Sequence, residues 1–201
     1  KYLSPHNAQI YESFRDKFDR FYDSEQHAIK NAVRKSDRVL DIGCNRAGLL
    51  VALKEIHGFV NYVGIDPDPA CIKIARKEHL ETEFIEGYFP EHVPKNKRYD
   101  SIFCLSLFTH FTDWKDKLSN MASICDRKII VDVAMTMTGA SVCDPDVSYS
   151  YYLGSGERAP YVVLNALQFT NFCFTEKVNA SRVEVVATRP KSDNSMAGVA
   201  I

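Results

Sequence analysis

The fold is decided by residues 39–48, which are Val39-Leu40-Asp41-Ile42-Gly43-Cys44-Asn45-Arg46-Ala47-Gly48. The short apolar run Arg38–Ile42 predicts a buried strand that ends at Gly43. The apolar spacing of Leu49–Ile56 predicts a helix that begins directly after the turn. A strand, a glycine turn and a helix in this order are typical of a βαβ unit, so the stretch predicts a parallel sheet covered by helices.

The same alternation continues along the chain. We expect further strands at Tyr62–Ile65, Thr82–Ile85, Ser101–Leu105 and Lys128–Val133, and further helices at Ala70–His79 and Trp114–Ile124. Strands that alternate with helices at this spacing predict an α/β fold, a three-layer Rossmann-like sandwich. We expect a mostly parallel, seven-stranded sheet with an antiparallel C-terminal hairpin.

The two ends of the chain differ from this pattern. Helices are predicted at Pro5–Phe21 and Ser24–Val33, a third at Ala159–Phe169, and a closing hairpin from Phe172–Val178 and Arg182–Thr188. The tail from Pro190 onward is expected to be loose. One domain is predicted over residues 1–201: a helical cap (1–36), a cofactor-binding core (38–133), a lid or acceptor loop (134–158), and a terminal helix and hairpin (159–190).

Composition excludes some classes of function. The 25 basic and 26 acidic side chains leave a net charge of −1, which argues against a strong non-specific nucleic-acid binder and against a membrane-surface protein. No apolar run approaches the roughly 20 residues that span a bilayer. The six cysteines form no C-x-x-C pair and no metal pattern. We therefore expect reduced thiols, no metal site and a cytoplasmic location.

Asp41 indicates the ligand more clearly than the glycines do. The G-x-N-x-x-G spacing after it is a weak dinucleotide fingerprint on its own. Asp41 lies two residues before the turn, where its charge would oppose a diphosphate held by the loop amides. The same charge suits a ligand with an ammonium and a sulfonium group, such as S-adenosylmethionine. An incidental aspartate in an ordinary βα turn is the alternative.

A second carboxylate follows the next strand. Asp66 lies 23 residues after Gly43, close to the offset at which an acidic residue accepts hydrogen bonds from a ribose diol. Pro67 cannot extend the strand, so the carboxylate is expected at the C-terminal edge of the sheet. Capping of the following helix is the alternative role for Asp66, although Asp68 is better placed for capping.

These two blocks resemble motif I and its acidic partner in the class I S-adenosylmethionine-dependent methyltransferases. The resemblance covers roughly residues 38–133, and the form Asp41-Ile42-Gly43-Cys44-Asn45 is similar to members that act on small molecules or glycans. It implies S-adenosylmethionine as cofactor, held by Asp41, Gly43, Cys44, Asn45, Asp66, Pro67, Gly87, Tyr88, Leu105 and Ser106. This sequence departs from the family where Asn45 and Ala47 replace two glycines and where Tyr88 replaces an acidic residue that holds the adenine.

His110 and Asp132 are the candidate catalytic residues. Methyl transfer requires alignment of the acceptor first and then, for a hydroxyl or a protonated amine, a base with a pKa near neutral. His110 comes shortly after the fourth predicted strand, where it is expected to act as a base, to position the acceptor, or to serve the structure alone. Asp132, late in the fifth strand, is a second base or an acceptor anchor, and the cluster Tyr149–Tyr152 could line the acceptor pocket.

The predicted function is methyl transfer to a small molecule or a glycan, with oxygen favoured over nitrogen. An RNA-end or nucleotide methyltransferase is a second hypothesis, which the near-neutral charge disfavours. A third is a binding partner that holds S-adenosylmethionine without turnover. An NAD-dependent dehydrogenase is a fourth, which the charge of Asp41 opposes.

Overall fold

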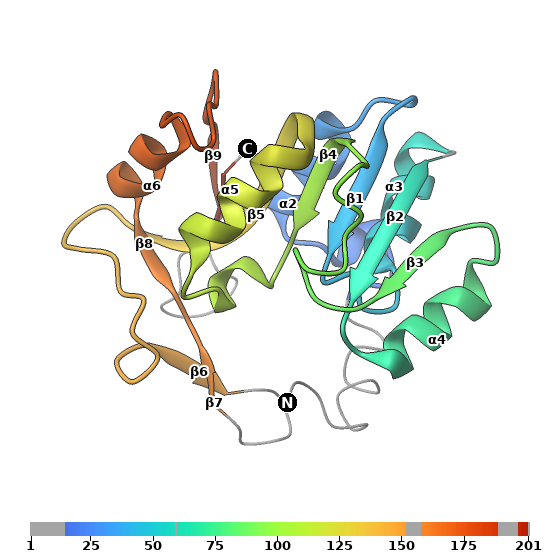
Figure 1. The fold of residues 1–201 in the computed structure, drawn as a ribbon, viewed down its shortest axis with the longest axis horizontal. Helices are drawn as coiled ribbons and strands as arrows, with labels where there is room; N and C mark the ends of the chain where they lie inside the picture. The colour runs from blue at the N-terminus through green and yellow to red at the C-terminus, as the bar shows by residue number, and fades with distance from the viewer. Residues whose placement is uncertain (1–14, 59, 152–157, 189–196, 201) are drawn as a thin grey trace.

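A mixed eight-stranded sheet forms the centre of the protein (Figure 1) in a computed structural model that describes residues 15–58, 60–151, 158–188 and 197–200. Its strands are β1 (Arg38–Ile42), β2 (Asn61–Asp66), β3 (Glu83–Glu86), β4 (Tyr99–Cys104), β5 (Cys125–Thr136), β8 (Val163–Asn165), β9 (Val185–Thr188) and β10 (Ala197–Ala200). They run in the order β3-β2-β1-β4-β5-β10-β9, and β8 pairs with the last part of β5. β10 is antiparallel to both of its neighbours, β5 and β9, and all the other neighbouring pairs are parallel.

Helices cover both faces of this sheet. They are η1 (Phe18–Arg20), α2 (Asp23–Ala32), α3 (Gly48–His57), α4 (Pro69–Glu78), η2 (Phe108–His110), α5 (Trp114–Ile124) and α6 (Ala166–Cys173). Buried side chains of η1, α2, α3 and α4 form one apolar cluster, while those of α5 and α6 form another on the opposite face. Figure 1 shows α5 in front of the sheet, with α2 and α3 behind it. The fold is therefore the predicted three-layer α/β sandwich.

The strand register brings the polar residues of the first strands to one edge of the sheet. Ile42 of β1 lies beside Ile65 of β2, and Asp66 of β2 lies beside Glu86 of β3. Because β1, β2, β3 and β4 are parallel, the segments that follow them all leave the sheet at this edge. This carboxyl edge is where α/β proteins of this type place their ligands.

The central elements match the sequence prediction closely. Helix α5 has the predicted bounds, and each of the five expected core strands is present within a few residues. The sheet has eight strands rather than seven, because the short β8 adds to β5. A separate two-stranded sheet is formed by β6 (Tyr149–Tyr151) and β7 (Arg158–Pro160), within and beside the predicted lid.

Three predictions for the ends of the chain were wrong. The first is the expected helix Pro5–Phe21. Its residues 15–21 form only a turn and η1, and its residues 5–14 lie outside the described residues. The expected helix Ala159–Phe169 begins with strand structure and becomes helical only at α6. The run Phe172–Val178 is no strand, because it holds the end of α6 and the turns after it; the antiparallel hairpin is β9 with β10 instead. The expected loose tail thus contains β10.

Candidate cofactor and acceptor site

A cavity of about 750 Å³ opens at the carboxyl edge of the sheet. Every residue predicted for the cofactor lines it, and so does His110: Asp41, Gly43, Cys44, Asn45, Asp66, Pro67, Gly87, Tyr88, Leu105, Ser106 and His110. Asp132 is not among the lining residues. The structure thus brings together residues from four successive strand ends in one concave site, which is the usual form of a small-molecule site.

The loop after β1 uses its own amide groups inside the protein. The amides of Gly43 and Cys44 both donate to the carbonyl of Ile65, at 2.8 and 3.1 Å. The Asn45 amide donates to Oδ2 of Asp66 at 2.9 Å, and the Ala47 amide donates to the carbonyl of Cys44. A dinucleotide site needs such amides directed at the diphosphate. These four amides are therefore not available to a diphosphate.

Two of the residues that replace family glycines adopt the glycine conformation. Asn45 and Ala47 have φ values of 48° and 68°, in the left-handed region, and Gly43 lies there too at 80°. This backbone is costly for alanine and less so for asparagine. The loop therefore keeps the turn expected for motif I although two glycines are missing.

Asp41 is buried at the floor of the cavity. Its Oδ2 accepts a hydrogen bond of 2.5 Å from the Tyr62 hydroxyl. Burial raises the pKa of Asp41 to about 7, the Tyr62 hydrogen bond opposes that shift, and the nearby Asp66 adds to it. A cationic ligand would relieve the cost of burying this charge.

Asp66 is held rigidly beside it. Its Oδ2 accepts the Asn45 amide and its Oδ1 accepts the Asp68 amide at 2.8 Å. Burial raises the pKa of Asp66, while these two amide bonds lower it. A carboxylate can accept about four hydrogen bonds, so Asp66 retains capacity for a diol. Capping is done by Asp68, whose carboxylate accepts the Ala70 amide, as predicted.

The remaining groups of the cavity fit S-adenosylmethionine. Oδ1 of Asn45 is buried without a hydrogen-bond partner, so this oxygen can accept a hydrogen bond from a ligand. A Cβ at Gly87 would lie 2.4 Å from the His92 ring, so only glycine fits there. Tyr88 is half exposed at the rim, with its ring centroid 6.4 Å from that of His92. The cavity therefore offers carboxylates, a free acceptor and aromatic faces.

His110 lies at the end of η2 and is hydrogen-bonded to the last residue of β7. Its Nδ1 is 2.6 Å from the carbonyl oxygen of Pro160. Since a carbonyl only accepts, Nδ1 carries the proton of this bond, and Nε2 is the basic nitrogen of the neutral ring. This contact fixes the orientation of a cavity-lining imidazole.

A buried polar network lies behind Ser106. The Ser106 amide donates to Oδ1 of Asp132, and its hydroxyl lies 3.4 Å from Oδ2 of the same carboxylate. Arg15 contacts both the Ser106 hydroxyl and Glu25, and its Nη2 is 3.6 Å from Asp132. Burial raises the pKa of Glu25 to about 8; Arg15 opposes this shift and Asp132 adds to it. Asp132 therefore supports the cavity wall rather than lining it.

Arg15 and Glu25 are site residues that the sequence did not reveal. Arg15 also lines the cavity, and its carbonyl oxygen would lie 2.1 Å from a Cβ on Gly48. Gly48 thus permits the close approach of the N-terminal segment to α3. Arg15 belongs to no local motif, and Glu25 lies in the first turn of α2, where its carboxyl accepts the Tyr22 amide. The prediction of a helix through residue 21 concealed their contact.

Two other expectations concern the tyrosine cluster of residues 149–152 and metal binding. The rings of Tyr149 and Tyr151 pack against each other in β6, with centroids 5.6 Å apart, and do not line the cavity; Tyr152 lies outside the described residues. Among the residues that the structure describes, no group of three or more His, Cys, Asp or Glu side chains could hold a metal ion.

Residues 7–132 match the protein family described as Methyltransferase domain. The chain belongs to this family. Membership confirms the resemblance to the class I methyltransferases and, with it, the prediction of an S-adenosylmethionine-dependent enzyme.

Solved methyltransferase structures share the fold of this methyltransferase at low sequence identity. A complex of the Haloferax volcanii Trm112 activator with a methyltransferase has a TM-score of 0.63 at 14% identity, with 98% of this chain and 94% of that chain covered. The plantazolicin methyltransferase BpumL, bound to a monoazolic desmethylPZN analogue and S-adenosylhomocysteine, has a TM-score of 0.61 at 14% identity. The match covers 97% of this chain and 86% of that chain. Coclaurine N-methyltransferase has a TM-score of 0.58 at 16% identity. The match covers 81% of this chain but only 48% of that enzyme, so this chain spans about half of its length.

The comparison of this methyltransferase with curated proteins finds no match. None of its described helices combines the length and apolar character that crossing a bilayer requires.

Proposed function

We propose that this methyltransferase transfers a methyl group from S-adenosylmethionine to a hydroxyl of a small molecule or a glycan. The proposal rests on one observation: the strand-end carboxylates Asp41 and Asp66 line the same cavity as the oriented imidazole of His110. The carboxylates fit the cofactor, and the imidazole fits an acceptor that must lose a proton.

The cofactor would be held by the residues of the first two strand ends. Asp41 would face its cationic groups, Asp66 would accept hydrogen bonds from the ribose hydroxyls, and Asn45 Oδ1 would accept from its ammonium group. When bound, S-adenosylmethionine supplies an electrophilic methyl group on a sulfonium. Leu105 and Ser106, at the end of β4, would flank the methionine part.

His110 would act on the acceptor side of the cavity. Its Nδ1 stays bonded to the Pro160 carbonyl, so Nε2 would take the hydroxyl proton as the acceptor oxygen forms its bond to the methyl carbon. The bond between that carbon and the cofactor sulfur would break in the same step, leaving S-adenosylhomocysteine and a protonated imidazole. Asp132 would act through Ser106, since it accepts the Ser106 amide. In this proposal His110 is the catalytic residue and Asp132 is a positioning residue.

A methyl-transfer assay over a panel of alcohols, phenols and sugars tests this function. His110→Ala should lower kcat by a factor of about 10² to 10⁴ and leave the affinity for S-adenosylhomocysteine within about twofold. His27→Ala, at an exposed site in α2, is the matched control and should change neither. An unchanged kcat in His110→Ala would exclude His110 as the base.

Calorimetry distinguishes the other hypotheses. Tight binding of S-adenosylhomocysteine with no turnover of any acceptor would indicate a non-catalytic binding partner. Affinity for RNA that falls steeply with salt would favour an RNA-end or nucleotide methyltransferase. Tight NAD binding would overturn the proposed cofactor role of the loop after β1.

A further inference from the structure

A second cavity, of about 420 Å³, lies at the opposite edge of the sheet from the cofactor site. It is lined by the start of β5, by α5 and α6, and by the loop 178–184. Lys128, near the start of β5, pairs with Ser101 in β4, whereas the cofactor cavity begins after the end of β4. The two cavities therefore belong to different ends of the same strands.

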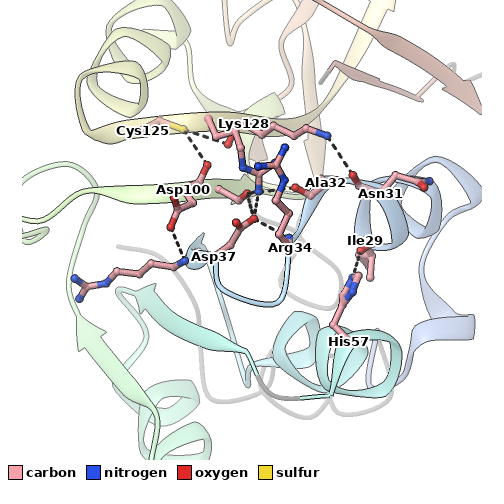
Figure 2. A network of polar contacts seen from close by, with 12 residues as sticks. Ile29, Asn31, Ala32, Arg34, Asp37, His57, Asp100, Cys125 and Lys128 are labelled. Atoms are coloured by element: carbon pink, nitrogen blue, oxygen red, sulfur yellow. Dashed lines mark hydrogen bonds and ion pairs between the residues drawn. The ribbon is translucent and has the colours of Figure 1, made fainter.

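Cationic side chains gather around this second cavity. Four of them line it: Arg34, Arg127, Lys128 and Arg182. Figure 2 shows Arg34 beside Asp37, whose carboxylate accepts the Arg34 amide at 2.8 Å, with Lys128 above both. None of these residues belongs to a sequence motif, and the net charge of −1 gives no sign that they meet in space.

The acidic groups nearby neutralise only part of this charge. Arg127 forms an ion pair with Asp37, and Arg182 forms one with Glu184 at 3.1 Å. Asp126, the other acidic residue of the lining, is paired with Arg98 at 2.6 Å. Within the described part of the chain, neither Arg34 nor Lys128 forms an ion pair; Lys128 donates to the Asn31 carbonyl at 3.1 Å (Figure 2).

Hydrogen-bond acceptors are also scarce in the cluster. Burial lowers the pKa of Lys128, and the charges of Arg127, Arg34 and Arg182 lower it further, against the effect of Glu184. Nε of Arg127 is buried without an acceptor. An anion in the cavity would offset this positive charge and supply the acceptor that Nε of Arg127 lacks.

We propose that this cavity binds the phosphate group of a small ligand, independently of methyl transfer. A phosphate offers two negative charges and several acceptor oxygens, which match guanidinium and ammonium donors converging from different elements. Asn179 and Ser181 lie in the same lining and add side-chain donors. The volume lies within the range of small-ligand pockets. The phosphate could come from a free polyphosphate or from a phosphate ester.

Calorimetry on the intact chain at low ionic strength tests the site, with inorganic pyrophosphate and AMP as probes. Both Arg34→Gln and Lys128→Gln should weaken binding of the preferred probe about tenfold, the order expected for loss of a charged hydrogen bond. Lys35→Gln, which removes the same charge from the exposed neighbour outside the lining, is the matched control and should leave the affinity within about twofold. Preference for pyrophosphate or for AMP identifies the free or the esterified source.

Three results would overturn the proposal. One is the absence of measurable binding of both probes to the wild-type protein. Another is an equal loss of affinity in Lys35→Gln, which would show non-specific attraction. The third is competition between pyrophosphate and S-adenosylhomocysteine, which would place the phosphate in the cofactor cavity. If Lys128→Gln fails to fold, the exposed Arg34→Gln decides alone.

Discussion

The proton on Asp41 links cofactor binding to pH. Burial raises the pKa of this carboxyl to about 7, so the ligand-free protein carries a partly protonated group at the floor of the cofactor cavity at neutral pH. A ligand with an ammonium group binds best to the ionised form. The proton must therefore leave as the ligand enters.

We expect the affinity for S-adenosylhomocysteine to rise with pH across this pKa. If only ionised Asp41 binds the ligand, affinity at pH 6 should be about tenfold lower than at pH 8. Calorimetry at several pH values measures this directly. In Asp41→Asn the affinity should be lower and its pH dependence largely lost, while the Asn side chain can still accept the Tyr62 bond. An equal slope in the variant would assign the dependence to another group.

Single residues also show what a sequence reveals about a site. Asp41 and Asp66 could be predicted because each lies at the carboxyl end of a strand, and strand ends in a parallel sheet meet at one edge. The resemblance placed Asn45 in the cofactor loop, but side-chain type alone could not show that Asn45 and Ala47 adopt the left-handed conformation of the glycines they replace. The hydrogen bonds of the Gly43 and Cys44 amides could not be predicted either, because their acceptor is the carbonyl of Ile65 in the neighbouring strand β2.

At the scale of elements, Gly48 joins the N-terminal segment to α3. A Cβ there would lie 2.1 Å from the Arg15 carbonyl oxygen. Gly48→Ala should displace Arg15 from the cavity, cost about 1–3 kcal/mol of stability by overpacking, and weaken binding of S-adenosylhomocysteine several-fold. Urea denaturation and calorimetry measure the two effects.

Gly58→Ala is the comparison for that experiment. Gly58 ends α3 with a φ of 75°, and a Cβ added there would have no other atom within 4 Å, so its substitution adds about 1–2 kcal/mol of backbone strain without a clash. Its cofactor affinity should stay at the wild-type value. If Gly48→Ala also keeps that affinity, the N-terminal segment does not contribute to the cofactor site.

Glu25 ties α2 to the same segment. Its carboxyl accepts the Tyr22 amide at 2.8 Å and contacts Arg15. Glu25→Ala should cost about 3 kcal/mol, because it leaves a buried guanidinium with fewer acceptors. Glu25→Gln should cost less, about 1 kcal/mol, because the amide oxygen can still accept one of these hydrogen bonds. Asp23→Ala, exposed at the start of α2, is the control and should change stability by about 0.5 kcal/mol or less.

The terminal elements were the hardest to predict. The run from Tyr161 to Leu164 has apolar residues at every position, so periodicity could not separate a helix from a buried strand. Residues 163–165 form a strand because they pair with the end of β5. The hairpin of β9 with β10 was missed because its arms are separated by eight residues that carry no short turn signal.

At the scale of the whole molecule, near-zero net charge conceals two sites of opposite sign. Buried carboxylates surround the cofactor cavity at one edge of the sheet, and cations gather at the other edge. The sequence total of 25 basic and 26 acidic residues averages over both. The positions of the charged side chains in the fold, and not the net charge, therefore indicate which ligands the two cavities suit.

The buried carboxyls determine how the stability of the whole protein depends on pH. The folded-state pKa is about 7 for Asp41 and about 8 for Glu25, and both lie above the values of 3.8 and 4.5 for the unfolded groups. Between these limits the folded protein binds more protons than the unfolded chain. Stability from these groups is thus fully present below about pH 4 and is lost as pH rises through 7 to 8. We expect the free energy of unfolding of the ligand-free protein to fall by roughly 1 kcal/mol or more per pH unit from pH 6 to 8.

Thermal melts of the ligand-free protein at pH 6, 7 and 8 measure this fall, with Asp41→Asn and Glu25→Gln combined in one variant as the control. The variant should show a flatter profile, because neither replacement titrates. Saturating S-adenosylhomocysteine should flatten the wild-type profile as well, since the ligand binds the ionised form of Asp41 and stabilises the folded state most at high pH. A ligand-free protein whose stability rises from pH 6 to 8 would contradict the burial of protonated carboxyls beneath the cofactor cavity.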